Sequence, residues 1–366
     1  MTVLREWGRI GVIGFGGPPA HVALLRELVV ERRGWIPARE FEDANAACQL
    51  LPGPASTQMS IFCARRVGGD AGAIAGGLAF ILPGLLVTLV IAAVALQADP
   101  PEWIEGFGAG AAAAVVAVVV QAGLQLGAAS VRGRARPALV RALLYAGLGA
   151  AATIAVGPFV VLVLLASGLI ELALRRSGRA ALHAWPLALP LAVTGAAALP
   201  ALAWTALKVG GLSYGGGFVI VPLMQGDAIN HGWLTQAEFA NAVAYGQITP
   251  GPVTHTIALI GYGAAGLPGA LLASAIAFAP SFAFVLIGGD HFESIRGRSG
   301  PRAFLDGAGP AAIGAILGAA VVLAAALEEP WQGAVLVLAG GLLALGRSPL
   351  LVLMAGAGAG LLSTIT

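Results

Sequence analysis

The stretch Gln49-Leu50-Leu51-Pro52-Gly53-Pro54 occurs again, in altered form, as Gln247-Ile248-Thr249-Pro250-Gly251-Pro252, 198 positions later. Further matches keep this order and nearly this spacing: Trp35 with Trp233, Phe41 with Phe239, Gly68 with Gly266, and Phe15-Gly16-Gly17 with Tyr214-Gly215-Gly216. Chance does not supply five such matches in one order, so the chain is predicted to contain two copies of one unit. Each copy places helix-breaking Gly and Pro residues within apolar sequence. This pattern is typical of membrane proteins whose binding site is built from interrupted helices.

The composition places most of the chain in a lipid bilayer. Hydrophobic residues make up 58% of the sequence and charged residues 10%, whereas a soluble domain carries about 25% charged residues. The net charge is only +2 and the basic residues lie between apolar runs, so no nucleic-acid partner is expected. Runs long enough to cross the bilayer are predicted near residues 72–97, 103–127, 137–156, 158–176, 184–204, 268–289, 303–327, 331–346 and 348–365.

Four segments of the first copy are too short to cross the membrane alone. They are 3–14, 18–33, 41–51 and 54–66, and they surround the Gly-Gly and Pro-Gly-Pro sequences. An arm of about 12–16 residues makes ~18–24 Å of helix, which reaches the middle of a ~30 Å hydrocarbon core and turns back. These arms are therefore predicted to form re-entrant helical hairpins, with counterparts in the second copy.

The charge of the loops predicts the orientation, because Lys and Arg accumulate on the cytoplasmic side. Loops with and without basic residues alternate along the nine spans when the N-terminus is cytoplasmic. The loop 26–39 holds four arginines, whereas its counterpart 225–240 holds no Lys or Arg. Equivalent loops are therefore predicted on opposite faces. The predicted fold is an all-α polytopic membrane protein with two inverted repeats, 1–183 and 205–366, joined by a transmembrane helix at 184–204.

The Pro-Gly-Pro tips are the strongest candidate for a binding site. A proline at the start of a helix suits its first turn, and the N–H groups that follow at 55–58 and 253–256 are free to bind an anion. The alternative is a structural kink. The candidate substrate-binding residues are Gly16, Gly17, Gln49, Pro52, Gly53, Pro54, Ser56, Thr57, Gln58, Gly215, Gly216, Gly217, Gln247, Pro250, Gly251, Pro252, Thr254 and His255.

Ionisable residues near the tips are candidates for guiding the anion or for carrying a coupling proton. The candidates are Arg65, Arg66, Lys208, Glu27 and Asp43, together with Glu42, Asp227 and Glu238. The alternative for the two arginines is a role as markers of the cytoplasmic end of a half-helix, and for the acids a place in a loop or an ion pair. His255 has two readings: it holds a proton or an anion, or it packs as a hydrogen-bonded histidine.

No cofactor is expected. Cys48 and Cys63 have no metal-binding spacing, and Gly16-Gly17 is not followed by the Gly-Lys-Ser/Thr of a nucleotide-binding loop. An ion gradient or anion exchange would then supply the energy. A membrane-embedded enzyme remains a rival reading, although it would need a nucleophile–base pair or a ligand set on one membrane face. The Gly/Ala-rich stretches 106–114 and 355–361 are either the faces of a homodimer or internal packing surfaces.

Several motifs resemble the chromate ion transporter family in its long, two-domain form. They are Phe15-Gly16-Gly17-Pro18, His21, Trp35, Gln49–Pro54, Leu212–Gly217, Gly232-Trp233-Leu234-Thr235, Gln247–Pro252 and Gly261-Tyr262. The resemblance covers roughly residues 5–130 and 205–325. It implies a secondary active transporter that exports chromate across the bacterial inner membrane and so gives chromate resistance. Transport of sulfate or another anion in the same fold, or a channel, is the alternative. Thr254-His255-Thr256 departs from the apolar residue expected after the second tip.

Overall fold

The computed structural model describes residues 1–51, 53–175, 198–213, 217–288 and 299–364. The secondary structure of this described part of the chain consists of helices, with no strand. Six of these helices are long and apolar enough to cross a membrane. The prediction of an all-α polytopic membrane protein is thereby confirmed. Most of the predicted span 184–204 lies outside the described residues, and its last seven residues belong to a helix that continues to Leu212.

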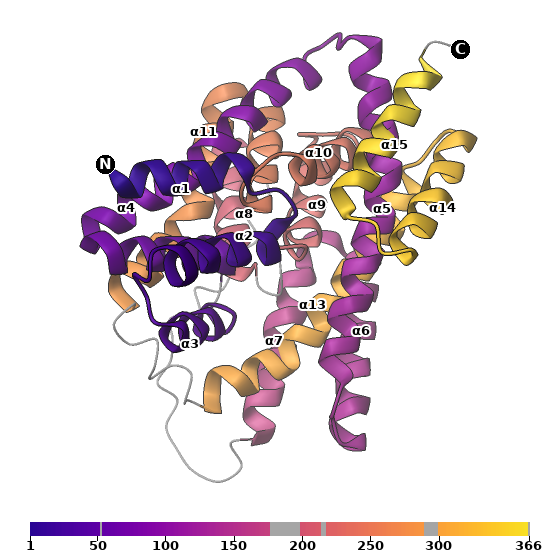
Figure 1. Cartoon of the computed structure of the whole chain (residues 1–366). Helices are drawn as coiled ribbons and strands as arrows, with labels where there is room; N and C mark the ends of the chain where they lie inside the picture. The colour runs from indigo at the N-terminus through magenta and orange to yellow at the C-terminus, as the bar shows by residue number, and fades with distance from the viewer. Residues whose placement is uncertain (52, 176–197, 214–216, 289–298, 365–366) are drawn as a thin grey trace.

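The first half of the chain contains seven α-helices (Figure 1). They are α1 (Thr2–Ile13), α2 (Gly17–Arg26), which a π-helical turn (Glu27–Arg32) continues, α3 (Ala38–Cys48), α4 (Ala55–Ala95), α5 (Glu102–Val131), α6 (Arg136–Ala155) and, after a 3-10 turn (Gly157–Phe159), α7 (Val160–Arg175). The described second half contains α8 (Ala198–Leu212), α9 (Ile220–Asn230), α10 (Gln236–Ile248), a 3-10 turn (Val253–His255), α11 (Thr256–Gly288), α13 (Ser299–Ala325), α14 (Pro330–Ala344) and α15 (Pro349–Ser363).

The long helices α4 and α11 carry the same kink. Gly69 has φ 65° and ψ −160°, and Gly266 has φ 62° and ψ −153°. Backbone at these angles is essentially restricted to glycine. The sequence match paired Gly266 with Gly68, so the structural counterpart is displaced by one residue. The kink also joins the predicted half-helix 54–66 and the predicted span 72–97 into one element.

The last two predicted spans, 331–346 and 348–365, are shorter in the structure. α14 and α15 have 15 residues each, which corresponds to ~22 Å and does not cross a ~30 Å core. The predicted break between them is present, and Gly346 adopts φ 78° there. Both helices pack along α5, on the right of Figure 1.

Glycines bring α15 and α5 into backbone contact. A Cβ built on Gly110 would lie 2.1 Å from the carbonyl oxygen of Gly356, and one on Gly106 would lie 2.5 Å from that of Gly360. Small residues allow membrane helices to approach this closely. The stretches 106–114 and 355–361 therefore pack against each other within one chain.

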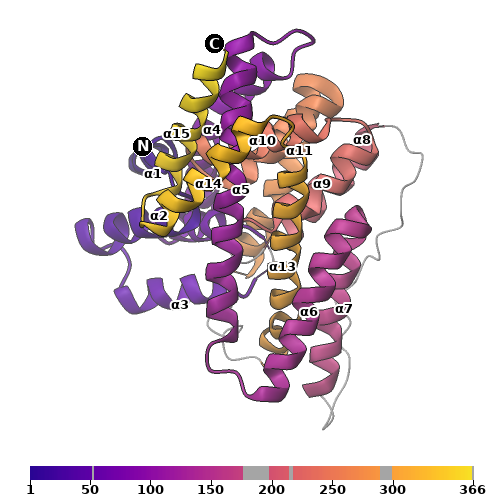
Figure 2. The same cartoon turned by 90° about the vertical axis from the view of Figure 1, so that its right-hand side faces the viewer.

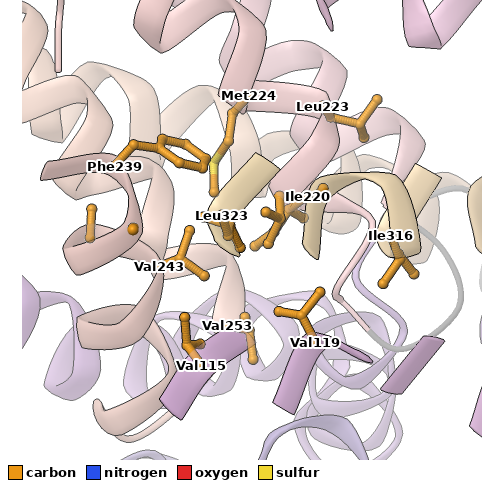
Figure 3. Packing of buried hydrophobic residues seen from close by; sticks show 14 of the residues in the cluster. Val115, Val119, Ile220, Leu223, Met224, Phe239, Val243, Val253, Ile316 and Leu323 are labelled. Atoms are coloured by element: carbon orange, nitrogen blue, oxygen red, sulfur yellow. The ribbon is translucent and has the colours of Figure 1, made fainter. Parts of the chain in front are cut away.

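The largest apolar core lies between α5, α9, α10 and α13 (Figure 3). Its side chains include Val115, Val119, Ile220, Met224, Phe239, Val243, Ile316 and Leu323, together with Val253 of the second tip. A second cluster, around Trp7, Phe41 and Phe80, unites α1, α3 and α4. In Figure 2, α5, α6, α7 and α13 run side by side, and the N-terminal helices lie to one side of them.

Candidate functional site

Both Pro-Gly-Pro tips turn the backbone in the same way. Gly53 has φ 110° and Gly251 has φ 84°, a conformation that favours glycine. Pro54 is the N-cap of α4, and Pro252 is the N-cap of the 3-10 turn that leads into α11. The prolines therefore precede the first turn, one position earlier than predicted. No side chain caps either helix start. The N–H groups of Thr57 and Gln58 donate to the Pro54 carbonyl oxygen and that of His255 donates to the Pro252 carbonyl oxygen, so the N–H groups left for another partner are those of the first residues of each turn, fewer than predicted.

The Gly-Gly tip of the first half meets the Pro-Gly-Pro tip of the second half. The Gly251 N–H donates to the Gly14 carbonyl oxygen at 2.9 Å. Gly17 opens α2 with φ 72°, and a Cβ on it would lie 3.7 Å from the Val253 side chain. Gly217, with φ 87°, lies equally close to Val253. The first Gly-Gly tip, the second Pro-Gly-Pro tip and Gly217, which ends the second Gly-Gly tip, are thus brought together.

The middles of α4 and α11 close over the Pro-Gly-Pro tips. A Cβ on Gly84 would lie 2.1 Å from the Pro250 carbonyl oxygen and 2.6 Å from the His255 ring. A Cβ on Gly53 would lie 3.0 Å from the Gly210 carbonyl oxygen and 3.7 Å from the Ser281 hydroxyl. Thus each half covers the other half's tip. Ser281 was not predicted, yet the spacing from Pro83-Gly84 to Pro280-Ser281 equals that between the kinks and could have identified it.

Several polar side-chain atoms near the tips are fully buried and form no hydrogen bond. The unpartnered atoms are Oγ1 of Thr57, Oγ of Ser60, Ser213 and Ser281, and Nε2 of Gln247. The ring nitrogens of His255 form no hydrogen bond of ordinary geometry and have only the carbonyl oxygens of Ile81 and Pro250 as weak partners. Thr57 and His255 are 0% exposed, and they are separated by the 198 residues of the repeated motif. A buried polar atom without a partner costs about 1–3 kcal/mol. Their concentration here indicates a place that a polar ligand completes.

Ser56 has a supporting role. The His21 Nε2 lies 2.9 Å from the Gly14 carbonyl oxygen, so this nitrogen donates, and Nδ1 accepts from the Ser56 hydroxyl at 3.3 Å. Burial lowers the pKa of His21, although its hydrogen bond to Gly14 acts in the opposite direction. The neutral ring ties the start of α4 to Gly14, which is itself bonded to the second tip.

The two predicted glutamines are not equivalent in this structure. Gln247 is half-buried, whereas Gln49 is exposed. Gln58 lies beside Gly53, with its Nε2 at 2.7 Å from where a Cβ would be, and Thr254 is buried in the second tip. Three predicted site residues, Pro52, Gly215 and Gly216, lie outside the described part of the chain.

Most of the predicted guiding or coupling residues lie away from the tips. Near the kink of α4, Arg65 donates to Asp70 at 2.7 Å, and it also donates to the Val285 carbonyl oxygen of α11. Arg66 pairs with Glu40, Asp43 lies 3.9 Å from Arg39, and Glu27 is exposed. Lys208 differs, because it is buried on α8 and forms an ion pair with Asp227 of α9.

The groups at the tips have the chemistry that suits a bound anion. Hydroxyl, amide and imidazole groups surround two helix N-termini, each of which carries about half a positive charge. In the described residues, no group of three His, Cys, Asp or Glu side chains could hold a metal ion. The tips therefore offer neutral donors and helix dipoles, which suit a small anion that has shed its water.

Comparison with known proteins agrees with this chemistry. Residues 1–172 and 200–361 match the model of the chromate transporter family. The chromate transport protein of Cupriavidus metallidurans is 32% identical over 327 residues, which cover 86% of this chain and 80% of that protein. The chromate transport protein of Pseudomonas aeruginosa is 29% identical over 337 residues, 88% of this chain and 80% of that protein. No solved structure matches the chain.

Proposed function

Because the chain belongs to the chromate transporter family, we propose that it exports chromate as a secondary active transporter of the bacterial inner membrane. Chromate is a tetrahedral dianion, and the tips would bind it through backbone N–H groups, hydroxyls and the His255 ring. The N-terminus lies in the cytoplasm in this proposal, in keeping with the four arginines of the loop 26–39.

One observation supports the site above all others: polar atoms that form no ordinary hydrogen bond are buried at equivalent places in both halves. Thr57 follows the first Pro-Gly-Pro tip and His255 follows the second, at the same distance along the chain. An apolar residue at either position would avoid the desolvation cost. The cost is offset if a charged ligand accepts hydrogen bonds from these groups, which are worth more than bonds between neutral partners.

The two halves would work as inverted repeats around this site. Matching kinks in α4 and α11, matching left-handed glycines at the tips and the mutual covering of the tips support a two-fold relation. Transporters built in this way bind substrate where the repeats meet and expose it to each side in turn. Without a nucleotide-binding loop, an ion gradient or anion exchange would supply the energy.

A flux assay with purified protein tests the proposal. Proteoliposomes that contain the protein should take up radiolabelled chromate saturably, and sulfate or molybdate should compete, because the tips recognise shape and charge. Cells that carry the protein should accumulate less chromate than cells without it. Transport of a different oxyanion but not chromate would overturn the substrate assignment, and lack of transport of any anion would overturn the anion site itself.

A further inference from the structure

Lys208 is the only lysine in the chain, since the other 19 basic residues are arginines. It lies on α8 and is 3% exposed, and its partner Asp227 lies on α9 and is 5% exposed. Lysine carries its charge on a compact ammonium group at the end of a flexible stem, whereas arginine binds a carboxylate with a rigid fork. The single lysine therefore stands where a charged pair is most deeply buried.

All contacts of this pair fall on one carboxylate oxygen. The Lys208 ammonium donates to Oδ2 of Asp227. The Thr205 hydroxyl, one turn earlier on α8, lies 2.5 Å from the same atom and 3.1 Å from the Ala201 carbonyl oxygen, and its one proton goes to the closer acceptor, the carboxylate. The second oxygen, Oδ1, can therefore take a proton without breaking either contact. The His231 ring contacts the main-chain oxygen of Asp227 at 2.9 Å. It therefore stabilises the end of α9, and the contacts of the carboxylate come from α8.

Other titratable groups on the surrounding helices have partners elsewhere. Glu238 of α10 belongs to the capping box of its own helix, and Tyr245 donates to the Ile104 carbonyl oxygen. Asp306 of α13 and Glu171 of α7 pair with arginines of α6, α7 and the segment after α5. The helix α11 contains no charged residue and one titratable residue, Tyr262. The helix α13 also carries Arg302 near its start, and the turn Gly157–Phe159 contains no charged residue. In the described part of the chain, no hydrogen bond or ion pair joins Tyr262 or Arg302 to Asp227. Within the described residues, Lys208 and His231 are thus the titratable groups that face Asp227.

A buried ion pair is a costly way to join two helices. Apolar residues of similar volume often stabilise a protein as well or better, whereas loss of one partner leaves an uncompensated charge. Ionisable residues within a membrane protein more often mark an ion pathway. The position supports such a role, because Lys208 is two residues from Gly210, whose carbonyl oxygen faces the Gly53 tip.

We propose that the Lys208–Asp227 pair is the site that couples a proton to anion transport. This inference rests on the proposed function. A proton from water on the open side binds Oδ1 of Asp227, so the pair changes from neutral to a net charge of +1. A dianion at the tips repels the Asp227 carboxylate and attracts the ammonium, so anion and proton raise each other's affinity and move together. The proton leaves Oδ1 to water when the anion leaves on the other side, so a net charge of −1 moves outward and the inside-negative membrane potential, rather than the proton gradient, drives export.

Proton movement is measured in proteoliposomes that contain an entrapped pH-sensitive dye, at an alkaline pH where chromate itself carries no proton. The wild-type protein should move about one proton with each chromate. Asp227→Asn, and the double variant Lys208→Met with Asp227→Leu, should keep chromate exchange but lose the coupled proton. Asp99→Asn, in an exposed loop, makes the same chemical change elsewhere and should behave as the wild type.

Thr205→Val gives a second test that removes no charge. Loss of the hydroxyl donor destabilises the charged form of the pair's carboxylate relative to its neutral form, so the pH of half-maximal flux should rise. An unchanged pH profile, a wild-type protein that moves chromate without protons, or a double variant with the wild-type proton ratio would overturn the inference and leave the proposed function intact. A wild-type protein that moves no chromate would overturn both.

Discussion

Thr57 and His255 show how a residue's environment can point to a ligand. Both side chains are completely buried, and both hold polar atoms that form no ordinary hydrogen bond in the described structure. Thr88, on the same helix as Thr57 and equally buried, donates its hydroxyl to the Gly84 carbonyl oxygen at 2.9 Å. The contrast between the two threonines separates a structural hydroxyl from one that is available to substrate.

We therefore expect Thr57→Val to weaken chromate transport without weakening the protein. Loss of a hydrogen bond to a charged ligand, about 1.5–3 kcal/mol, should raise the KM about 10- to 150-fold. Thermal unfolding in detergent should occur at the same or a higher temperature, because an unpartnered hydroxyl is removed. Thr88→Val is the matched control and should keep the wild-type KM. Equal KM values for both variants would remove Thr57 from the site.

At the scale of elements, α4 and α11 are organised by their glycines. The kinks at Gly69 and Gly266 have open space around the missing Cβ, so only the backbone conformation demands glycine there. Gly84 is different, because its backbone touches Pro250 of the opposite tip. One class of glycine shapes a helix, and the other lets a helix approach the binding site.

Gly69→Ala and Gly266→Ala should each lower the free energy of unfolding by about 1–3 kcal/mol, since alanine is strained in that conformation. The two losses should be similar because the dihedral angles are nearly the same. Gly147→Ala is the control, because that glycine of α6 has ordinary helical geometry and free space. Chemical denaturation in detergent measures all three. A loss from Gly147→Ala as large as the others would show that the kinks are not special.

Gly84→Ala should instead act on the site. Its Cβ would fall 2.1 Å from the Pro250 oxygen, so α4 or the second tip must move. In proteoliposomes that hold equal amounts of protein, we expect chromate uptake by the variant to be at least tenfold slower than by the wild type. Uptake assays normalised to immunoblots provide the measurement. Wild-type uptake would mean that the contact between α4 and the tip is not needed for transport.

Sequence reasoning identified the elements whose breaks involve Gly and Pro, because these residues act locally on the backbone. It placed both Pro-Gly-Pro tips, and it missed the shift from Gly68 to Gly69, since a one-residue offset changes no local signal. Pairings between distant residues were out of reach. Nothing in the sequence predicts that Lys208 pairs with Asp227. Nor does it predict that Gln247 is more buried than Gln49. Both facts follow from how the helices pack.

At the scale of the whole molecule, the two halves are packed unequally. α10 is buried against α5, α9 and α11, whereas α3 packs chiefly on α4 and leaves Gln49 exposed. A transporter with two-fold related halves opens to one side when equivalent helices are packed differently. In the proposed inverted arrangement, α3 and α10 would lie at opposite membrane faces.

Cysteine labelling tests the inversion. Ala38 begins α3, Gln236 begins α10, and both are exposed. With Cys48 and Cys63 replaced by alanine, Ala38→Cys should react with an impermeant reagent only from the cytoplasm and Gln236→Cys only from outside. Reaction of both residues from the same side would rule out inverted repeats and the export path built on them.

The central claim is that tips from both halves form one anion site. Equilibrium binding of radiolabelled chromate to purified protein tests it most directly, with Thr57→Val and His255→Leu as one substitution from each half. The account predicts one chromate per chain in the wild type and a weaker affinity at that single site in both variants. Two chromate sites per chain, or an unchanged affinity in either variant, would contradict it.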